Sequence, residues 1–387
     1  MDLRAVDAAL QQWIDRDQLA GVSYAVLRGG ALAAQRCLGW ADKEAREPLR
    51  DDHLFRIFSN TKLVTGCAAL QLLEQGRFSL DDPIGEYIPA LANLQVLRPG
   101  ATALDDTEPA REPVRIRHLL THTAGFTYAF LQPDAAIARA YVAAGLVDPA
   151  LDLARMMEAL GKLPLLFQPG SAWNYSVATD VVGRLIEVVG GQPLDACFQQ
   201  HVFDPLGMHD TFFFVPQEQA HRLAALYVGD LQEPARPGLR RADQLPYPGA
   251  FLQRVPRLNA GGGLVSSLGD HATLVRVLLQ GGAPLLKPAT MPLLTGNQLA
   301  PGQWVRFPGA PVIEGRGHSL VASVTVHTSA ANAASVPGEL QWGGLAGTQW
   351  FISPQENLAA VLMTQRYMGF GLPYWDEFKQ LVRGIPG

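Results

Sequence analysis

The stretch Phe55-Arg56-Ile57-Phe58-Ser59-Asn60-Thr61-Lys62 stands at the start of a predicted helix. The helix is predicted from Asn60 because apolar residues then recur at helical spacing, and Gly76 follows where a left-handed C-terminal cap belongs. The apolar residues expected on one face are Leu63, Cys67, Leu70 and Leu73. This stretch therefore places a serine and a lysine, three residues apart, at the N-terminal end of a helix.

The pair Ser59 and Lys62 suits nucleophilic catalysis. Residues three apart on a helix lie about 5–6 Å from each other, so the Lys62 amine can accept the Ser59 proton if burial keeps the amine neutral. The positive end of the helix dipole also favours a developing oxyanion at the Ser59 N–H. The alternative is a serine N-cap beside a solvent-exposed lysine. The chain has 12 serines and 5 lysines, so chance gives about 0.15 such pairs, and the single pair present favours the functional interpretation.

Strand-like segments lie at both ends of the chain, and the middle is mostly helical. Residues 21–27 and 31–38 are predicted to form a β-hairpin. A period of two predicts further antiparallel strands over 320–326, 340–344, 348–352 and 358–363. Helices are predicted over 6–13, 151–160, 177–189 and 374–382.

This order predicts an α+β (mixed α/β) fold, in which an antiparallel sheet built from both chain ends is flanked by helices and a mainly helical lobe packs against it. The expected α/β sheet domain comprises residues 1–58 and 301–387, and the expected helical domain comprises residues 59–300. Clefts form where two such lobes meet, so we expect the active site there. Residues 227–259 and 328–337 are long for plain connections and are candidates for walls or lids of the cleft.

Two further stretches suit roles near the serine and lysine. Tyr175 precedes the helix over 177–189, where it is either a half-buried packing residue or a phenol that shuttles a proton for the Ser/Lys pair. Asp180, in the first turn of that helix, is expected to stabilise the helix dipole. Gly343-Gly344 interrupt a predicted strand, which indicates either a close approach of another group, such as a substrate carbonyl, or a bulge.

Composition and charge exclude several classes of function. The chain has 387 residues and a net charge of −5, with 31 Lys plus Arg against 36 Asp plus Glu. It carries no basic run, so neither nucleic acid nor a membrane surface is an expected partner. Three separated cysteines and an N-terminus without a visible export signal predict a reduced, cytoplasmic location. A small molecule is the expected partner, and the oligomeric state is not predicted.

Two other kinds of site are disfavoured by the sequence. His118 and His122 are spaced as on a zinc-binding helix, but no glutamate follows His118 and no third ligand can be named nearby. We therefore predict no metal and no cofactor. An α/β-hydrolase is disfavoured because the chain contains no Gly-x-Ser-x-Gly motif and lacks an alternating strand-helix pattern.

In their order and spacing, these segments resemble the serine β-lactamase and penicillin-binding superfamily, specifically the branch of class C β-lactamases, D-Ala-D-Ala carboxypeptidases and family VIII carboxylesterases. The resemblance covers nearly the whole chain. Ser59-Asn60-Thr61-Lys62 resembles the serine-lysine motif, Tyr175-Ser176-Val177 stands where class C enzymes carry Tyr-x-Asn, and Trp342-Gly343-Gly344 stands where they carry Lys-Thr-Gly. Residues 79–84, 119–126 and 261–267 are also similar. Val177 and Trp342 depart from the class C pattern, and both look like family VIII esterases.

The resemblance implies roles for individual residues. Ser59 would be the nucleophile, with Lys62 and Tyr175 as the base and the proton shuttle. The N–H groups of Ser59 and Leu345 would form the oxyanion hole. The residues implied to line the pocket or contact the substrate are Tyr128, Trp342, Gly343 and Gly344.

The implied function is a serine carboxylesterase that hydrolyses short neutral esters through an acyl-enzyme on Ser59. Weak or no β-lactam hydrolysis is expected, because the Trp342 indole offers no charge to the β-lactam carboxylate, although a nearby arginine such as Arg316 would supply one. Alternatives on the same fold are an acyltransferase, a β-lactamase and a D-Ala-D-Ala-type peptidase. The non-enzyme alternative is an inactive binding module. The natural ester, its acyl length and the stereoselectivity are not predicted.

Overall fold

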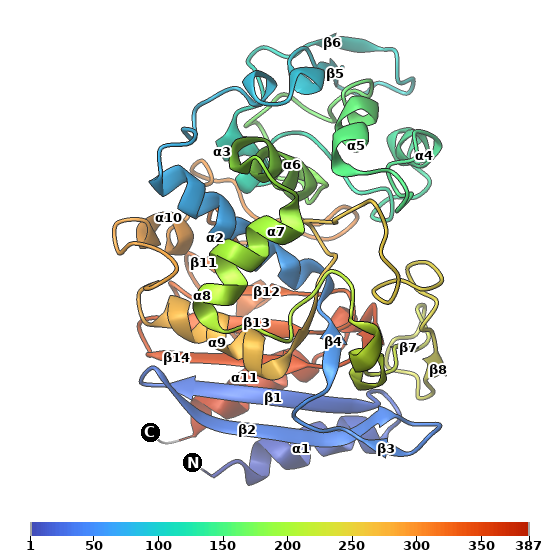
Figure 1. Ribbon diagram of the computed structural model, residues 1–387, viewed down its shortest axis with the longest axis vertical. Coiled ribbons are helices and arrows are strands. Elements are labelled where there is room, and N and C mark those ends of the chain that lie inside the picture. Colours follow the sequence, from blue (N-terminus) through green and yellow to red (C-terminus); the bar gives the residue numbers. More distant parts are fainter. Residues whose placement is uncertain (1, 386–387) are drawn as a thin grey trace.

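Both ends of the chain build one antiparallel sheet in the computed structural model, which describes residues 2–385 (Figure 1). The N-terminal hairpin pairs with the C-terminal strands, and Tyr24 stands opposite Leu362 in that register. The order of the eight strands across the sheet is β10 (Arg316–His318), β11 (Ser323–Thr325), β12 (Leu340–Gly343), β13 (Gln349–Ser353), β14 (Leu358–Met363), β1 (Gly21–Arg28), β2 (Ala31–Asp42) and β3 (Glu47–Pro48). The predicted α+β fold with a sheet from both chain ends is confirmed.

The central strand β1 is apolar on both faces because both faces of the sheet are covered. Tyr24 and Val26 point into a core shared with the two terminal helices, whereas Ala25 and Leu27 point into the main core on the opposite face. Successive side chains of a strand alternate between faces, so a strand covered on both sides reads as a continuous apolar run.

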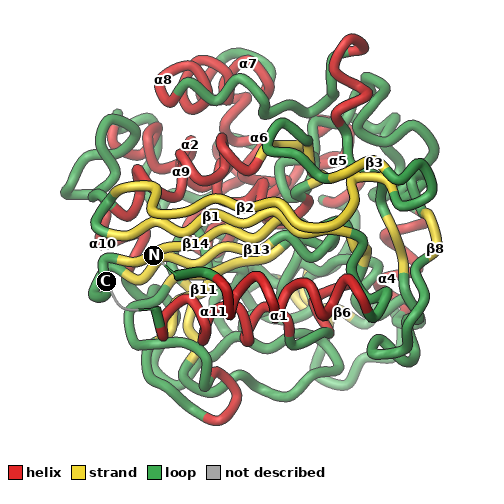
Figure 2. Tube along the Cα trace, turned by 90° about the horizontal axis from the view of Figure 1, so that it is seen from below, coloured by secondary structure: helices red, strands yellow, loops and turns green. Residues whose placement is uncertain are grey.

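Helices cover both faces of the sheet (Figure 2). On one face, α1 (Arg4–Asp15) packs against α11 (Tyr374–Gly384). On the other face, α9 (Leu268–Leu279) packs on β14 and β1. The expected boundary at residue 300 assigned α9 to the helical region, but the structure places this helix against the sheet. The other α-helices are α2 (Thr61–Glu74), α3 (Ile116–Leu120), α4 (Ala136–Ala143), α5 (Leu153–Leu160), α6 (Ala178–Gly190), α7 (Leu194–Phe198), α8 (Asp204–Leu206) and α10 (Met291–Thr295).

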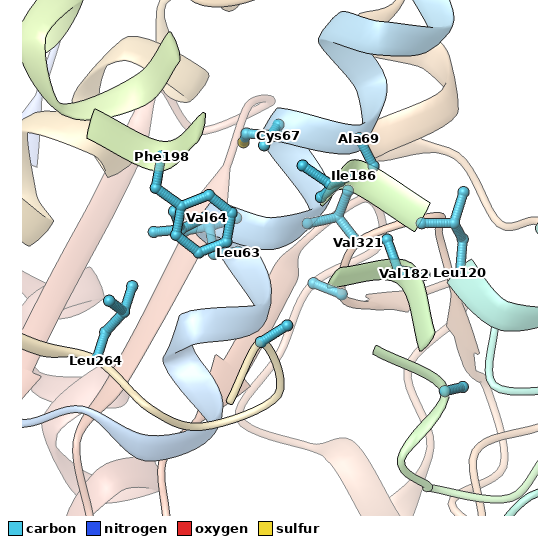
Figure 3. Close-up of a cluster of buried hydrophobic side chains, with 14 of the residues drawn as sticks. Leu63, Val64, Cys67, Ala69, Leu120, Val182, Ile186, Phe198, Leu264 and Val321 are labelled. Carbon is cyan, nitrogen blue, oxygen red and sulfur yellow. The ribbon is translucent and has the colours of Figure 1, made fainter. Parts of the chain in front are cut away.

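The helix α2 is buried on almost every side, not only along the predicted stripe (Figure 3). It contacts α6 on one side, while Val321 from the sheet region lies against Gly66 on another. A Cβ on Gly66 would lie 2.7 Å from a Val321 methyl carbon, so this face of the helix needs a glycine. A single apolar stripe is typical of a surface helix, whereas α2 forms the centre of the main core.

Short strand pairs connect the rest of the chain to this framework. One pair joins β4 (Leu54–Arg56) to β9 (Val265–Ser267), which brings the segment before β9 next to the start of α2. Further pairs join β15 (Arg366–Tyr367) and β8 (Arg240–Arg241) to β7 (Tyr227–Val228), and β5 (Gln95–Leu97) to β6 (Thr107–Pro109). Within residues 2–385, no helix combines the length and the apolar character needed to cross a membrane.

The two long irregular stretches have different positions. Residues 227–259 contribute Tyr247 and Phe251 to the wall of a cavity of about 880 Å³, as predicted. Residues 328–337 do not line that cavity. Asn332 and Ser335 are buried instead, and the Ser335 hydroxyl accepts a hydrogen bond of 2.7 Å from the Lys379 amine of α11. The prediction that this second stretch forms part of the cleft was wrong, because Ser335 binds the terminal helix and the Asn332 amide donates to the carbonyls of Glu314 and His327.

Candidate active site

A cavity of about 880 Å³ lies between the end of β12 and the helical region. Ser59, Tyr128, Tyr175 and Trp342 line it, together with apolar and aromatic side chains from several loops. The structure therefore brings together residues from distant parts of the sequence. A cavity of this size is typical of a small-molecule site.

Ser59 lies in a single turn of 3-10 helix, Phe58–Asn60, that leads directly into α2. Phe58 has a φ of 42°, in the left-handed region that is costly for a residue with a side chain. The ring of Phe58 packs edge-on against Phe251, with centroids 5.4 Å apart. This packing, together with the pairing of β4 with β9, holds the turn that presents Ser59 to the cavity.

Lys62 lies one helical turn beyond Ser59, and its amine is buried. Its Nζ atom lies 3.5 Å from the Ser59 Oγ, donates to the Gly261 carbonyl at 2.6 Å and contacts the Tyr128 hydroxyl at 3.1 Å. Burial lowers the pKa of Lys62 to about 7, and the nearby Asp180 carboxylate opposes this shift. A substantial fraction of the amine is therefore neutral at neutral pH and able to accept a proton.

Tyr175 lies just before α6 and makes the shortest contact with the serine. Its Oη lies 2.6 Å from the Ser59 Oγ, and the Lys62 Nζ lies 4.6 Å from the centre of its ring. Burial raises the pKa of the Tyr175 hydroxyl, so the phenol is protonated at neutral pH. Of the two side chains, the Lys62 amine is therefore the one able to accept a proton near neutral pH, whereas the Tyr175 hydroxyl keeps its proton and donates it in the hydrogen bond to the Ser59 Oγ.

Asp180 does more than face the N-terminus of α6. Its side chain is buried and lines the cavity, and its Oδ1 accepts a hydrogen bond of 3.2 Å from the Gly261 N–H. Burial raises the pKa of the Asp180 carboxyl, although Lys62 and Arg257 act in the opposite direction. The sequence predicted the position of Asp180 near the N-terminus of α6. It did not predict the hydrogen bond of Asp180 to Gly261, whose carbonyl binds Lys62.

The glycines at the end of β12 allow a close approach, but the approaching group belongs to the protein. A Cβ on Gly344 would lie 2.2 Å from the Ile57 carbonyl oxygen and 2.4 Å from the Thr348 Oγ1. The Asn60 amide donates to the same Thr348 hydroxyl at 3.1 Å. Gly344 thus lets the strand end pack directly against the turn that carries Ser59, while the next residue, Leu345, lines the cavity beside it.

Trp342 lies among aromatic rings rather than beside a cation. Its ring centroid is 5.4 Å from that of Tyr175 and 5.6 Å from that of His318. Two arginines from residues 2–385 line the cavity, Arg257 and Arg316. Arg316 lies on β10, which β11 separates from the strand of Trp342.

Three features of this site were not predicted from the sequence. The first is the Gly261 carbonyl, which accepts the shortest hydrogen bond of the Lys62 amine. The second is that Tyr128 contacts Lys62, whereas it was expected only to line the pocket. The third is His122, whose ring packs against Tyr175. The glycine-rich stretch 261–263 was a usable signal for the first of these, because such a run indicates close backbone packing.

The fold and the Ser59, Lys62 and Tyr175 cluster define a class, the serine hydrolases that share the β-lactamase fold. A sequence model of the beta-lactamase family matches residues 6–378, and the chain belongs to that family. Esterase EstB from Burkholderia gladioli is 32% identical over 97% of this chain and 94% of its own length. Lovastatin esterase from Penicillium rubens is 30% identical over 87% of this chain and 86% of its own length.

A solved structure agrees with this assignment. EstCE1, described as a hydrolase with promiscuous acyltransferase activity, superposes with a TM-score of 0.83 at 29% identity, over 98% of each chain. The predicted resemblance to the carboxylesterase branch of the serine β-lactamase superfamily is confirmed by these comparisons.

Proposed function

We propose that the protein is a serine carboxylesterase that hydrolyses short neutral carboxylic esters through an acyl-enzyme on Ser59. The observation that carries the proposal is the contact of the Ser59 Oγ with the Tyr175 Oη at 2.6 Å and with the Lys62 Nζ at 3.5 Å, inside a largely apolar cavity. Relatives named as esterases support the reaction type.

In the proposed reaction, the Ser59 oxygen attacks the ester carbonyl carbon and its proton passes to Lys62, either directly or through Tyr175. The N–H groups of Ser59 and Leu345 stabilise the negative carbonyl oxygen. Collapse of this intermediate breaks the bond to the alcohol, which leaves with a proton from the same pair of side chains. Water then attacks the acyl-enzyme by the reverse sequence and releases the acid.

The environment of Trp342 supports a neutral substrate. A penicillin or cephalosporin carries a carboxylate next to its reactive amide, and burial of that charge without a partner costs several kcal/mol, on the order of 3–5. An indole offers one N–H donor and an apolar face, which suit an uncharged group. The rings of Tyr175 and Phe307 extend this apolar surface around Trp342.

We expect kcat/KM for p-nitrophenyl esters of short acids to exceed that for a chromogenic cephalosporin by about a thousandfold or more. Both constants are measured on one preparation. The variant Arg316→Gln tests whether Arg316, which lines the cavity, supplies a positive charge to the β-lactam carboxylate. We expect the ratio of the two kcat/KM values to be the same in this variant as in the parent. Comparable turnover of the two substrates, or a cephalosporin activity that Arg316→Gln removes, would refute the argument from Trp342.

The pKa of Lys62 predicts the pH dependence of the reaction. Its lowering to about 7 means that the amine is protonated, and inactive as a base, below that pH and neutral above it. We therefore expect kcat/KM for a neutral ester to rise between about pH 6 and about pH 8 with a midpoint near 7. Initial rates in buffers of constant ionic strength measure this, and a profile that is flat over the same range contradicts the role given to Lys62.

Acyl transfer to an alcohol is a second candidate function. The rings of Phe307 and Trp342 line the cavity and lie 5.7 Å and 5.4 Å from that of Tyr175, so the region beside the nucleophile favours an apolar acceptor over water. The described activity of EstCE1 is consistent with this. Product analysis with 1-butanol present distinguishes the two, because transfer yields the butyl ester whereas hydrolysis yields only the acid.

A further inference from the structure

The motif over residues 119–126 has no role in the mechanism above, yet it lies directly behind Tyr175. His122 lies two residues beyond the end of α3, in the turn that follows this helix. Its φ is 57°. Histidine is among the few residues with a side chain that are enriched in this left-handed region. After this turn, the chain runs beside the segment that contains Tyr175.

The main chain of this motif holds the segment on both sides of Tyr175. The Asn174 N–H donates to the His122 carbonyl at 2.9 Å, and the Val177 N–H donates to the Thr127 carbonyl at 3.3 Å. The Asn174 amide side chain also donates to the Phe126 carbonyl at 2.7 Å. Tyr175 is therefore bracketed by hydrogen bonds from one neighbouring segment.

The His122 side chain contacts the same segment from within. Its ring centroid lies 5.1 Å from that of Tyr175, and its Nδ1 lies 3.4 Å from the Ser176 Oγ. His318 also packs edge-on against the His122 ring, with centroids 5.4 Å apart. The pKa of His122 is lowered by burial and by the neighbouring His318 and Lys62. The imidazole is therefore neutral where it packs against the Tyr175 ring.

We infer that His122 is a positioning residue, whose imidazole ring holds the Tyr175 hydroxyl at the Ser59 oxygen. The inference rests on the proposed function, because it matters only if Tyr175 transfers the proton. A displacement of about 1 Å at a reacting group can lower a rate by about a hundredfold, so a side chain that prevents such a displacement has a measurable effect.

His118, one residue before the motif, provides a matched control. It is also buried, but its Nδ1 accepts a hydrogen bond of 3.2 Å from the Arg115 N–H at the start of α3. Its ring makes none of the aromatic contacts that surround Tyr175 in the described part of the chain. Loss of this imidazole affects the start of a helix and not the tyrosine.

The test compares His122→Asn with His118→Asn. Asparagine tolerates the left-handed backbone, so the turn and its hydrogen bond to Asn174 are retained while the ring is lost. We expect His122→Asn to lower kcat for a p-nitrophenyl ester by about tenfold to a hundredfold with KM within about twofold, and His118→Asn to change kcat by less than about threefold. Thermal unfolding of both variants measures the general loss of stability.

A double-mutant cycle with Tyr175→Phe identifies the route of the effect. If His122 acts through the Tyr175 hydroxyl, His122→Asn lowers kcat by less than about twofold in the Tyr175→Phe background. Equal losses in both backgrounds, or a kcat of His122→Asn within twofold of the parent, overturn the inference while the proposed function stands. A neutral Tyr175→Phe overturns the inference together with the proton-transfer role of Tyr175.

Discussion

Replacement of Ser59 by alanine is expected to lower kcat for ester hydrolysis by at least about ten-thousandfold, because the proposed reaction proceeds through an acyl-enzyme on the Ser59 oxygen. The fold should be retained. The Ser59 hydroxyl contacts only the side chains of Tyr175 and Lys62 among the described residues, and both keep their packing when it is removed. Circular dichroism and the unfolding temperature check this.

Covalent labelling gives a direct measurement of the same prediction. A phosphonate or fluorophosphonate should add to Ser59 in the parent enzyme, and peptide mass spectrometry should locate the adduct there. The exposed Ser79→Ala is the control, and it should label and turn over like the parent. An adduct on another residue, or Ser59→Ala turnover within tenfold of the parent, would show that the nucleophile is wrong. Absence of both labelling and turnover in the parent would favour the inactive binding module.

Lys62 and Tyr175 are expected to act with Ser59 as one unit. Lys62→Met and Tyr175→Phe should each lower kcat by about a thousandfold, and the double variant should lose no more than about threefold beyond the worse single variant. The reason is that both side chains serve one proton transfer, so removal of either already stops it. Methionine is preferred to alanine because it fills most of the buried volume of the lysine side chain.

Tyr128→Phe is the matched control for this pair. Its hydroxyl contacts Lys62 at 3.1 Å, yet no hydrogen bond joins it to Ser59 in the described residues. We expect a much smaller loss from it, about tenfold or less. Steady-state kinetics on all four variants give the comparison. Independent, multiplicative losses for Lys62→Met and Tyr175→Phe, or a neutral Tyr175→Phe, would contradict the shared role.

Much of the fold was predictable because local pattern and tertiary environment agree. The hairpin predicted over 21–27 and 31–38 corresponds to β1 and to most of β2, and the period-two segment over 358–363 corresponds to β14. The helix start after Ser59 was predictable for the same reason, since apolar spacing and the cap at Gly76 depend on neighbours in the sequence. The burial of α2 on all sides was missed, although Val64, Ala68, Ala69 and Leu72 make this segment apolar around its circumference, which is typical of a buried helix.

The sequence by itself determined the spacing of Ser59 and Lys62, because one helical turn is a local property of the backbone. Only the tertiary structure decided what that pair can do. The pKa of Lys62 depends on burial beneath the Gly261 loop, and the position of Tyr175 at Ser59 depends on a segment that His122 packs against. These contacts join residues far apart in the chain, and their energies come from desolvation and packing that no local pattern encodes.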